Sequence, residues 1–468
     1  MTEPSRTAAI VLAAGAGTRF GGGKLLAGLA GRPVLDHVLG TLAEAGLAET
    51  IVVIGPSSAG LAAVAAARGA RICLNPRPGD GLSSSVRVGL QALAAGHEAG
   101  RIDAALIALG DQPLTAPSTL SALMAADVPG GRSIVVPHFA QGGSLNPALV
   151  LAGAWRLADE LEGDRGFGPL IKAHPELVVE VPLSGDNADV DTPGDLAALA
   201  WDLRVRANRE QAERVREAPS AADFYGPISG LFRANPARTD DPVLDALLAR
   251  ARPADTWLDV GAGAGRFALP LALHVRAVVA LDPSPGMLGA LREIAGQHGI
   301  TNVRTILDRW PRLGRQPGDE TAADAALIAH VGYDIEPIGP FLGALEAAVR
   351  RECVAILNDQ TPAAAASAFW PAIHGEERAE LPALPEFLEL LRARGTALEV
   401  VQVERRPRDY PSRDDLRRWV RQQLFVAEGS PRDRRLRELV DRATVETGRG
   451  VHLADQPAGV VGVVSWPA

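Results

Sequence analysis

The feature that most constrains this chain is a glycine-rich segment near its N-terminus, Leu12-Ala-Ala-Gly-Ala-Gly-Thr-Arg-Phe-Gly-Gly-Gly-Lys24, which directly follows a short apolar run. An apolar strand that ends in such a turn is typical of an α/β sheet. Glycines let backbone N–H groups approach oxygen atoms closely, and Arg19 and Lys24 supply two cations that offset negative charge. The segment therefore predicts a polyphosphate-binding loop at the edge of a sheet.

Two common phosphate loops do not fit this segment. The Walker pattern needs Ser or Thr directly after its lysine to reach Mg²⁺, and Lys24 is followed by Leu25. The dinucleotide pattern has no use for the pair of cations at Arg19 and Lys24. What remains is a loop of the kind that serves nucleotidyl transfer.

Composition limits the classes of protein to which the chain can belong. A length of 468 residues predicts two or three domains, and 47% hydrophobic with 22% charged residues is a globular balance. The net charge of −9 argues against a broad nucleic-acid surface, and no apolar run is long enough to predict a membrane span. The N-terminus leads straight into a strand without room for a signal peptide, and Cys73 and Cys353 are expected to be reduced and buried. We therefore expect a cytoplasmic protein.

The order of apolar runs predicts two α/β domains in tandem, each a doubly wound, Rossmann-like sheet. We expect the first at 1–200, with a parallel sheet, and the second at 223–468; the charged segment 201–222 between them is interpreted as a solvated linker helix. The predicted strands are 8–14, 50–55, 71–74, 103–109, 133–137 and 177–181, then 256–260, 277–281, 303–307, 323–329, 354–357, 397–403 and 460–465; helices are predicted at 34–45, 83–95 and 117–126.

Four further segments of the first domain carry polar residues where strands end or helices begin. They are Asn75-Pro76 with Gly81-Leu-Ser-Ser-Ser85, Gly110-Asp-Gln-Pro113, Gly163-Asp-Arg-Gly166 and Asp189-Val-Asp-Thr-Pro193. A carboxylate beyond a strand end is well placed to bind Mg²⁺. Taken singly, each segment has a plainer reading as a turn or a helix cap. Their order behind a phosphate loop favours a shared site.

This ordered set resembles the molybdenum cofactor cytidylyltransferases, over about residues 6–200. The motifs that carry the resemblance are the loop 12–24 with Leu25-Leu26, the triple serine, Gly110-Asp-Gln-Pro113, Asn146-Pro-Ala-Leu149 and Asp189-Val-Asp-Thr-Pro193. The sequence departs from the family at Gly166-Phe167-Gly168, where Gly-Ala-Arg is expected, so one cation for the pterin phosphate is missing.

The resemblance implies transfer of CMP from CTP to the terminal phosphate of a molybdopterin-type cofactor, with release of pyrophosphate and with a molybdoenzyme as the recipient. In that reaction Arg19 and Lys24 hold the triphosphate, Asp111 binds Mg²⁺ and Asp191 assists. The expected nucleotide-binding residues are Leu12, Ala13, Ala14, Gly15, Gly17, Arg19, Lys24, Ser83, Ser84 and Ser85; Arg19, Lys24 and Asp111 are the expected catalytic residues.

The second domain has its own glycine turn, Gly261-Ala-Gly263-Ala-Gly265, directly after a predicted strand. Asp259 stands before the first glycine, where a dinucleotide fingerprint keeps an apolar residue, and Asp282 ends the next strand. This pattern resembles the class I S-adenosylmethionine-dependent methyltransferases over about residues 223–468, and the terminal strand 460–465 fits the extra antiparallel strand of that fold. The resemblance implies that Asp259, the three glycines and Asp282 bind S-adenosylmethionine. His330 and Tyr333 follow the fourth strand and are candidates to face the methyl group.

Three other readings of the first domain remain open at this point. One is a sugar-phosphate nucleotidyltransferase, which the absence of a long insertion disfavours. The second is a reductase that binds NAD(P)H on the same scaffold, against which the carboxylate pair of Asp111 and Asp191 argues. The third is a non-catalytic chaperone for the molybdenum cofactor, with the C-terminal half as a docking module.

Overall fold

The computed structural model describes residues 2–140, 144–164, 166–185, 187–217, 223, 230, 232–312, 321–405, 408–448, 450–454 and 459–468. The chain divides into two compact units, Met1–Leu196 and Ala197–Ala468, and each is described by itself. No helix among these residues is long and apolar enough to cross a membrane. Cys73 and Cys353 are both free thiols; Cys353 is buried as predicted, whereas Cys73 is only partly buried.

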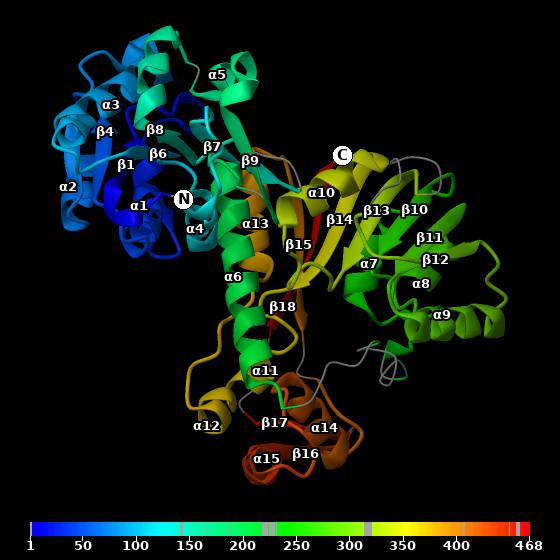
Figure 1. Cartoon of the computed structure of the whole chain (residues 1–468). Coiled ribbons are helices and arrows are strands. Elements are labelled where there is room, and N and C mark those ends of the chain that lie inside the picture. Colours follow the sequence, from blue (N-terminus) through cyan, green and yellow to red (C-terminus); the bar gives the residue numbers. More distant parts are fainter. Residues whose placement is uncertain are drawn as a thin grey trace. The chain divides into compact units, whose positions relative to one another are not determined.

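The first unit is built on a seven-stranded sheet with the strand order β5-β4-β1-β6-β8-β7-β9 (Figure 1). The strands are β1 (Thr7–Leu12), β4 (Glu49–Ile54), β5 (Arg71–Leu74), β6 (Ala104–Leu109), β7 (Ile134–Phe139), β8 (Ala148–Leu151) and β9 (Val178–Leu183), with a small hairpin of β2 (Gly28–Leu29) and β3 (Arg32–Pro33). The helices are α1 (Val34–Glu44), α2 (Ala59–Ala67), α3 (Leu82–Glu98), α4 (Pro117–Ala125) and α5 (Gly168–Ala173).

Helices cover both faces of this sheet. Residues Ile10 and Leu12 of β1 share one core cluster with α3, and the alternating residues Ala9 and Val11 are equally buried on the other face. This two-sided burial explains the near-continuous apolar runs that predicted the strands. The prediction of a parallel sheet was wrong at β8, which runs antiparallel to both β6 and β7. Residues 140–147 between β7 and β8 are too few for the crossover that a parallel connection needs.

The second unit contains another seven-stranded sheet, with the order β12-β11-β10-β13-β14-β18-β15. Its last strand, β18, is antiparallel to β14 and β15, as the resemblance to methyltransferases implied. The strands are β10 (Thr256–Val260), β11 (Ala277–Asp282), β12 (Val303–Leu307), β13 (Ala323–Ala329), β14 (Val349–Asn358), β15 (Glu399–Arg405) and β18 (Gly459–Pro467).

Two core clusters lie on opposite faces of the second sheet, which confirms the doubly wound prediction. Leu258 and Val260 pack on one face with α6, α10 and α13, whereas Trp257 packs on the other with α7, α8 and α9. The bounds of these helices are α6 (Pro193–Val215), α7 (Pro242–Leu248), α8 (Ala268–Ala272), α9 (Pro285–Gln297), α10 (Ile338–Ala347) and α13 (Leu384–Ala393).

Helix α6 differs from the solvated linker that its charge predicted. Trp201 and Val205 are buried in the core of the second unit, and the Trp201 indole N–H donates to the carbonyl of Ile335. Arg204 and Arg214 on the polar side pair with glutamates of the same unit. The charge pattern was read correctly as a helix, but a buried apolar stripe between the charges makes the helix part of the domain.

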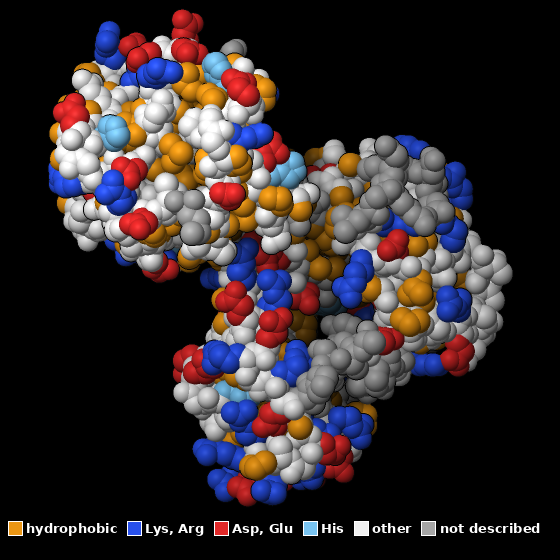
Figure 2. Space-filling view, in the orientation of Figure 1, with side chains coloured by type: hydrophobic (Ala, Val, Ile, Leu, Met, Phe, Trp, Pro, Cys, Tyr) orange, Lys and Arg blue, Asp and Glu red, His pale blue; other side chains and the backbone are white. Residues whose placement is uncertain are grey.

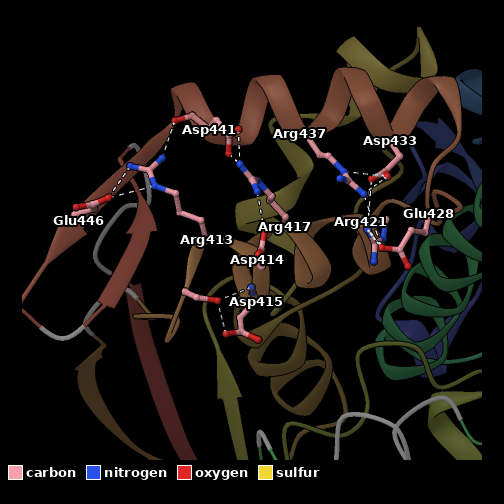
Figure 3. A network of polar contacts seen from close by, with 11 residues as sticks. Arg413, Asp414, Asp415, Arg417, Arg421, Glu428, Asp433, Arg437, Asp441 and Glu446 are labelled. Atoms are coloured by element: carbon pink, nitrogen blue, oxygen red, sulfur yellow. Dashed lines mark hydrogen bonds and ion pairs between the residues drawn. The ribbon is translucent and has the colours of Figure 1, made fainter.

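A small helical subdomain completes the second unit, with its own core around Trp370, Leu416 and Val420. It contains α11 (Ala364–Ser367), α12 (Trp370–His374), α14 (Arg413–Gln423), α15 (Pro431–Arg442), β16 (Thr444–Thr447) and β17 (Gly450–Leu453). Its arginines face carboxylates: Arg417 pairs with Asp441, and Arg437 pairs with the buried Asp433 (Figure 3). Basic and acidic side chains are accordingly interspersed over this subdomain (Figure 2).

Candidate active sites

The loop after β1 is shaped by glycines in the left-handed backbone region. Gly17, Gly21, Gly22 and Gly23 have φ of 59°, 86°, 97° and 69°, which residues with a β-carbon rarely adopt. The Gly22 N–H donates to the Gly17 carbonyl at 3.1 Å and closes the turn. The chain then enters a short 3₁₀ turn, Lys24–Leu26, so that Lys24 stands at a fixed place behind the loop.

Lys24 is the centre of an ion-pair network that joins the predicted catalytic residues. Its Nζ lies 2.5 Å from Asp111 Oδ2 and 3.2 Å from Asp191 Oδ1. The other oxygen of Asp191 accepts from Arg19 Nη1 at 3.1 Å. Four residues from three separate segments of the sequence therefore meet at the carboxyl edge of the sheet, next to the ends of β1 and β6. The residues that the ordered motifs assigned to one site lie together.

The two acidic loops are tied to each other by polar contacts that the sequence did not reveal. The Val190 N–H donates to the Asp111 carbonyl at 2.9 Å, and Gln112 Nε2 donates to Asp189 Oδ1 at 2.7 Å. Asn187 Nδ2 donates to Gln112 Oε1 at 3.0 Å. Gln112 and Asn187 are both buried, so this network fixes the distance between Asp111 and Asp191. Gln112 and Asp189 both belong to motifs that the sequence analysis singled out, whereas Asn187 lies outside those motifs.

Electrostatics at this site follow from partial burial among opposite charges. Burial lowers the pKa of Lys24, but its hydrogen bonds and charge pairing with Asp111 and Asp191 outweigh burial and raise the pKa overall. The pKa of Asp189 is raised by burial and by the neighbouring charges of Asp111 and Asp191, against the hydrogen bond from Gln112. Lys24 is therefore firmly cationic at neutral pH.

The same carboxylates fit a divalent cation. Asp111 Oδ1 is buried and accepts no hydrogen bond within the described part of the chain. An unpartnered carboxylate oxygen beside a second carboxylate suits Mg²⁺, which needs only one or two protein carboxylates when phosphates and waters complete its shell. Among the described residues no group of three or more His, Cys, Asp or Glu side chains forms a cage that would hold the ion without them.

A pocket of about 460 Å³ lies directly beside the loop. One wall is the loop itself, from Ala14 to Gly17 with Lys24, and the opposite wall is the turn after β4, Gly55-Pro-Ser-Ser58. This is the size range of pockets that hold small ligands. Sequence reasoning missed the β4 wall, although a Gly-Pro-Ser-Ser turn after a buried strand was a usable signal.

The triple serine, Ser83–Ser85, lies in the first turn of α3, where two of its side chains form structural hydrogen bonds. Asn75 Nδ2 donates to Ser84 Oγ at 2.8 Å and to Ser85 Oγ at 2.9 Å, and the Ser84 hydroxyl donates to the Gly81 carbonyl. The Ser83 hydroxyl is buried and has no partner among the described residues. Leu12 and Ala13 are likewise buried at the end of β1. Contact of these residues with a nucleotide stays a prediction, and Arg165 of the Gly163–Gly166 motif lies outside the described residues.

In the second unit, the glycine turn and two aspartates form a compact site after β10 and β11. Asp282 accepts from the Gly263 N–H and the Ser284 N–H, both at 2.8 Å. A β-carbon on Gly261 would lie 2.3 Å from Val331 Cγ2, and one on Gly265 would lie 2.8 Å from Leu269 Cγ. These two glycines are therefore required by close packing as well as by their positive φ.

Asp259 is the most perturbed carboxyl of this site. It is 1% exposed, and its Oδ1 accepts no hydrogen bond from the described residues. Burial, with a smaller contribution from the charge of Asp282, raises the pKa of Asp259 to about 8. A buried carboxylate that lacks a partner costs free energy in the free protein and is well suited to a cationic ligand.

The residues after β13 are arranged around Tyr333. The Asn358 N–H donates to the Tyr333 hydroxyl at 2.7 Å, and His330 Nδ1 lies 3.5 Å from the same hydroxyl. His330 has a positive φ of 56°, which is unusual for a residue with a β-carbon. The structure therefore brings His330 and Tyr333 together at the carboxyl edge of the sheet, and their relation to a methyl group stays a prediction.

Comparison with known proteins assigns both units. The model of the MobA-like NTP transferase domain matches residues 9–178, and that of a methyltransferase domain matches residues 258–339. The nicotine blue oxidoreductase of Paenarthrobacter nicotinovorans is 31% identical over 193 residues, which is 39% of this chain and 91% of that protein.

Two further proteins are similar to part of this chain. A 2-C-methyl-D-erythritol 4-phosphate cytidylyltransferase of Cereibacter sphaeroides is 40% identical over 124 residues, 26% of this chain, and the chain spans about half (53%) of that enzyme. The crystal structure of Rv0371c from Mycobacterium tuberculosis is 28% identical, with a TM-score of 0.37 over 42% of this chain and 99% of that one. The chain thus belongs to the MobA-like NTP transferase family and carries a methyltransferase domain after it.

Proposed function

We propose that the first unit transfers CMP from CTP to the terminal phosphate of a molybdopterin-type cofactor and releases pyrophosphate. The observation that carries the proposal is the convergence of Lys24 and Arg19 with Asp111 and Asp191 beside an open pocket. Cations suit a triphosphate and paired carboxylates suit Mg²⁺, so the site has residues for binding the nucleotide and residues for binding the metal.

In this reaction the protein positions charges and forms no covalent intermediate. The acceptor phosphate oxygen attacks the α-phosphorus of CTP in line, and the bond to the pyrophosphate oxygen breaks. Lys24 and Arg19 orient the triphosphate and offset its charge, while Asp111 and Asp191 hold the cation. Mg²⁺, when bound, stabilises negative charge on the transferring and leaving phosphates. Gln112 acts as a positioning residue, because it holds the loop of Asp191 through Asp189.

The choice of CTP and of a pterin acceptor rests on the motif resemblance. It is supported by a cytidylyltransferase among the relatives, although the aligned region covers only 26% of this chain. The test is pyrophosphate release from CTP or GTP with Mg²⁺ and molybdenum cofactor. Asp111→Asn is expected to lower the rate on the order of 100-fold or more, whereas the exposed Asp127→Asn leaves it unchanged. Equal pyrophosphate release from CTP and GTP would refute the selection of cytosine. Full activity of Asp111→Asn would refute the assignment of the active site.

A second candidate function is favoured by one comparison. The relative whose length the chain covers to 91% is named an oxidoreductase, so the same scaffold in this chain is a candidate to bind NAD(P)H instead of CTP. The two functions are separated by offering NADPH and a dye acceptor in the absence of Mg²⁺. Metal-independent oxidation of NADPH, unchanged in Asp111→Asn, supports the reductase; no oxidation, together with CTP-dependent pyrophosphate release, supports the transferase.

For the second unit we propose binding of S-adenosylmethionine as a methyl donor. The buried, unpartnered carboxyl of Asp259 suits the ammonium group of the methionine moiety, and Asp282 suits the ribose hydroxyls. Titration calorimetry with S-adenosylmethionine tests the proposal. We expect binding by the full chain and none by Asp259→Ala, while absence of binding by the unchanged protein would refute the proposal.

A further inference from the structure

The groups of the first site that would bind a metal–nucleotide complex are bound to one another in the free protein. Lys24 Nζ bridges Asp111 and Asp191, and Arg19 closes the network on the outer oxygen of Asp191. The side chains of Lys24 and Asp111 are only 15% and 20% exposed, so water replaces this pairing poorly. Two cations and two carboxylates make the network neutral.

A neutral, partly buried network resists either ligand when that ligand comes alone. A divalent cation at Asp111 and Asp191 must displace the Lys24 ammonium or approach it as a like charge. A triphosphate that draws Lys24 and Arg19 away leaves the carboxylates of Asp111 and Asp191 without the cations that pair with them in the free protein. Binding of either ligand alone therefore leaves a partly buried charge without a partner of opposite sign.

We propose that Lys24 is a placeholder for the divalent cation, and that the site takes up metal and nucleotide only together. This inference rests on the proposed function of the same site. When both ligands bind, Asp111 and Asp191 change partner from Lys24 and Arg19 to the metal, and Lys24 and Arg19 change partner from the carboxylates to the phosphates. Every group exchanges one opposite charge for another, so no buried charge is left without a partner.

The local structure leaves room for this exchange. Arg19 has a side chain that is 80% exposed, so little packing holds it to Asp191. The stem of Lys24 runs past Gly17, where an added β-carbon would lie 3.4 Å from Lys24 Cγ. The Lys24 head group can turn from the carboxylates toward the neighbouring pocket that its own residue lines.

The experiment measures binding of Mn²⁺ alone, as a spectroscopic substitute for Mg²⁺, by electron paramagnetic resonance of the full chain without nucleotide. Lys24→Met keeps the apolar stem and removes the charge, and we expect it to bind Mn²⁺ on the order of tenfold more tightly than the unchanged protein. Lys24→Arg keeps the cation and is expected to exclude Mn²⁺ as before. Lys172→Met, on the exposed side of α5, is the matched control and should change nothing.

A second measurement tests the coupling of the two ligands in the unchanged protein. CTP is expected to tighten Mn²⁺ binding at least tenfold, and Lys24→Met should lose most of that coupling. Unchanged or weaker Mn²⁺ binding by a folded Lys24→Met, judged by its melting temperature, overturns the placeholder role. If Lys24→Met gains Mn²⁺ affinity but no variant or unchanged protein binds CTP, the placeholder stands and the proposed transferase falls.

Discussion

Replacing Asp259 with asparagine is expected to change how the stability of the second unit depends on pH. Asp259 is buried at the end of β10, and its pKa is raised from 3.8 to about 8, first by burial and then by Asp282. The folded state therefore keeps a proton that the unfolded state loses. Because the folded state binds more protons between these two values, stability falls as the pH rises from about 4 to about 8.

The magnitude follows from the width of that window. Each pH unit inside it costs about 1.4 kcal/mol. Between pH 6 and pH 8 Asp259 therefore removes about 2 kcal/mol from the free energy of unfolding, since its titration levels off near pH 8. Asparagine has the same shape and no charge, so Asp259→Asn should lack this slope. The other titrating groups are common to both proteins and cancel in the difference.

Urea unfolding at pH 6, 7 and 8, followed by tryptophan fluorescence, measures this difference. Trp155 is the tryptophan of the first unit and the others belong to the second, so the signal reports mainly on the unit that carries Asp259. Asp259→Asn should gain about 2 kcal/mol relative to the unchanged protein as the pH rises from 6 to 8. A difference that stays constant over this range would refute the assignment of a buried, protonated carboxyl.

Three further substitutions test the burial of α6, the packing of the glycine turn and the network of Gln112. Trp201→Ala should cost about 3–5 kcal/mol of the stability of the second unit in urea, because its indole is buried in that core. Gly261→Ala should cost about 1–3 kcal/mol and weaken S-adenosylmethionine binding in calorimetry, since its β-carbon would collide with Val331 at a positive φ. Gln112→Ala should lower the rate of pyrophosphate release at unchanged nucleotide affinity, because it frees Asp189 and the loop behind it.

Each of these has a control that separates the stated cause from general damage. Glu210→Ala, on the exposed side of α6, should leave stability within about 0.5 kcal/mol; a similarly small loss for Trp201→Ala would restore the linker interpretation. Gly263 also has a positive φ, of 54°, but a β-carbon there would meet no atom within 4 Å. Gly263→Ala therefore carries the backbone strain without the collision, and equal harm at Gly263 and Gly261 would refute the collision. A Gln112→Ala protein with normal rate and stability would show that its network does not position the site.

Much of the first site followed from sequence, because its motifs sit where strands end. The loop after β1 and Asp111 after β6 were both placed by a buried apolar run followed by a polar turn, and parallel strands bring such turns to one edge of the sheet. The pocket wall at Gly55–Ser58 was not found, because its residues have no charge to mark them. The pairing of Lys24 with carboxylates could not be foreseen, because the motif predicts a residue's ligand but not its partner in the free protein.

The antiparallel β8 and the role of α6 are features that local sequence patterns could not predict. The Asn146–Leu149 motif was noticed, but no strand was predicted there. The direction of β8 depends on the neighbours that it pairs with, β6 and β7. Helix α2 was missed because its alanines carry little amphipathic signal, and only Ala65 is buried there. In α6, the many charges hid a stripe whose burial depends on the sheet of the second unit being present.

Two α/β domains and the residue types at their strand ends could be predicted from the sequence, because burial on both faces of a sheet requires apolar runs, which end only at the edge of the sheet. Which of these residues meet depends on the folded arrangement of the strands and loops. Lys24 and Asp191 are separated by most of the first unit in sequence, and the contact between the loops of Asp111 and Val190 brings them to 3.2 Å. Distances across a sheet depend on strand order and register, and neither can be read from local patterns in one amino-acid sequence.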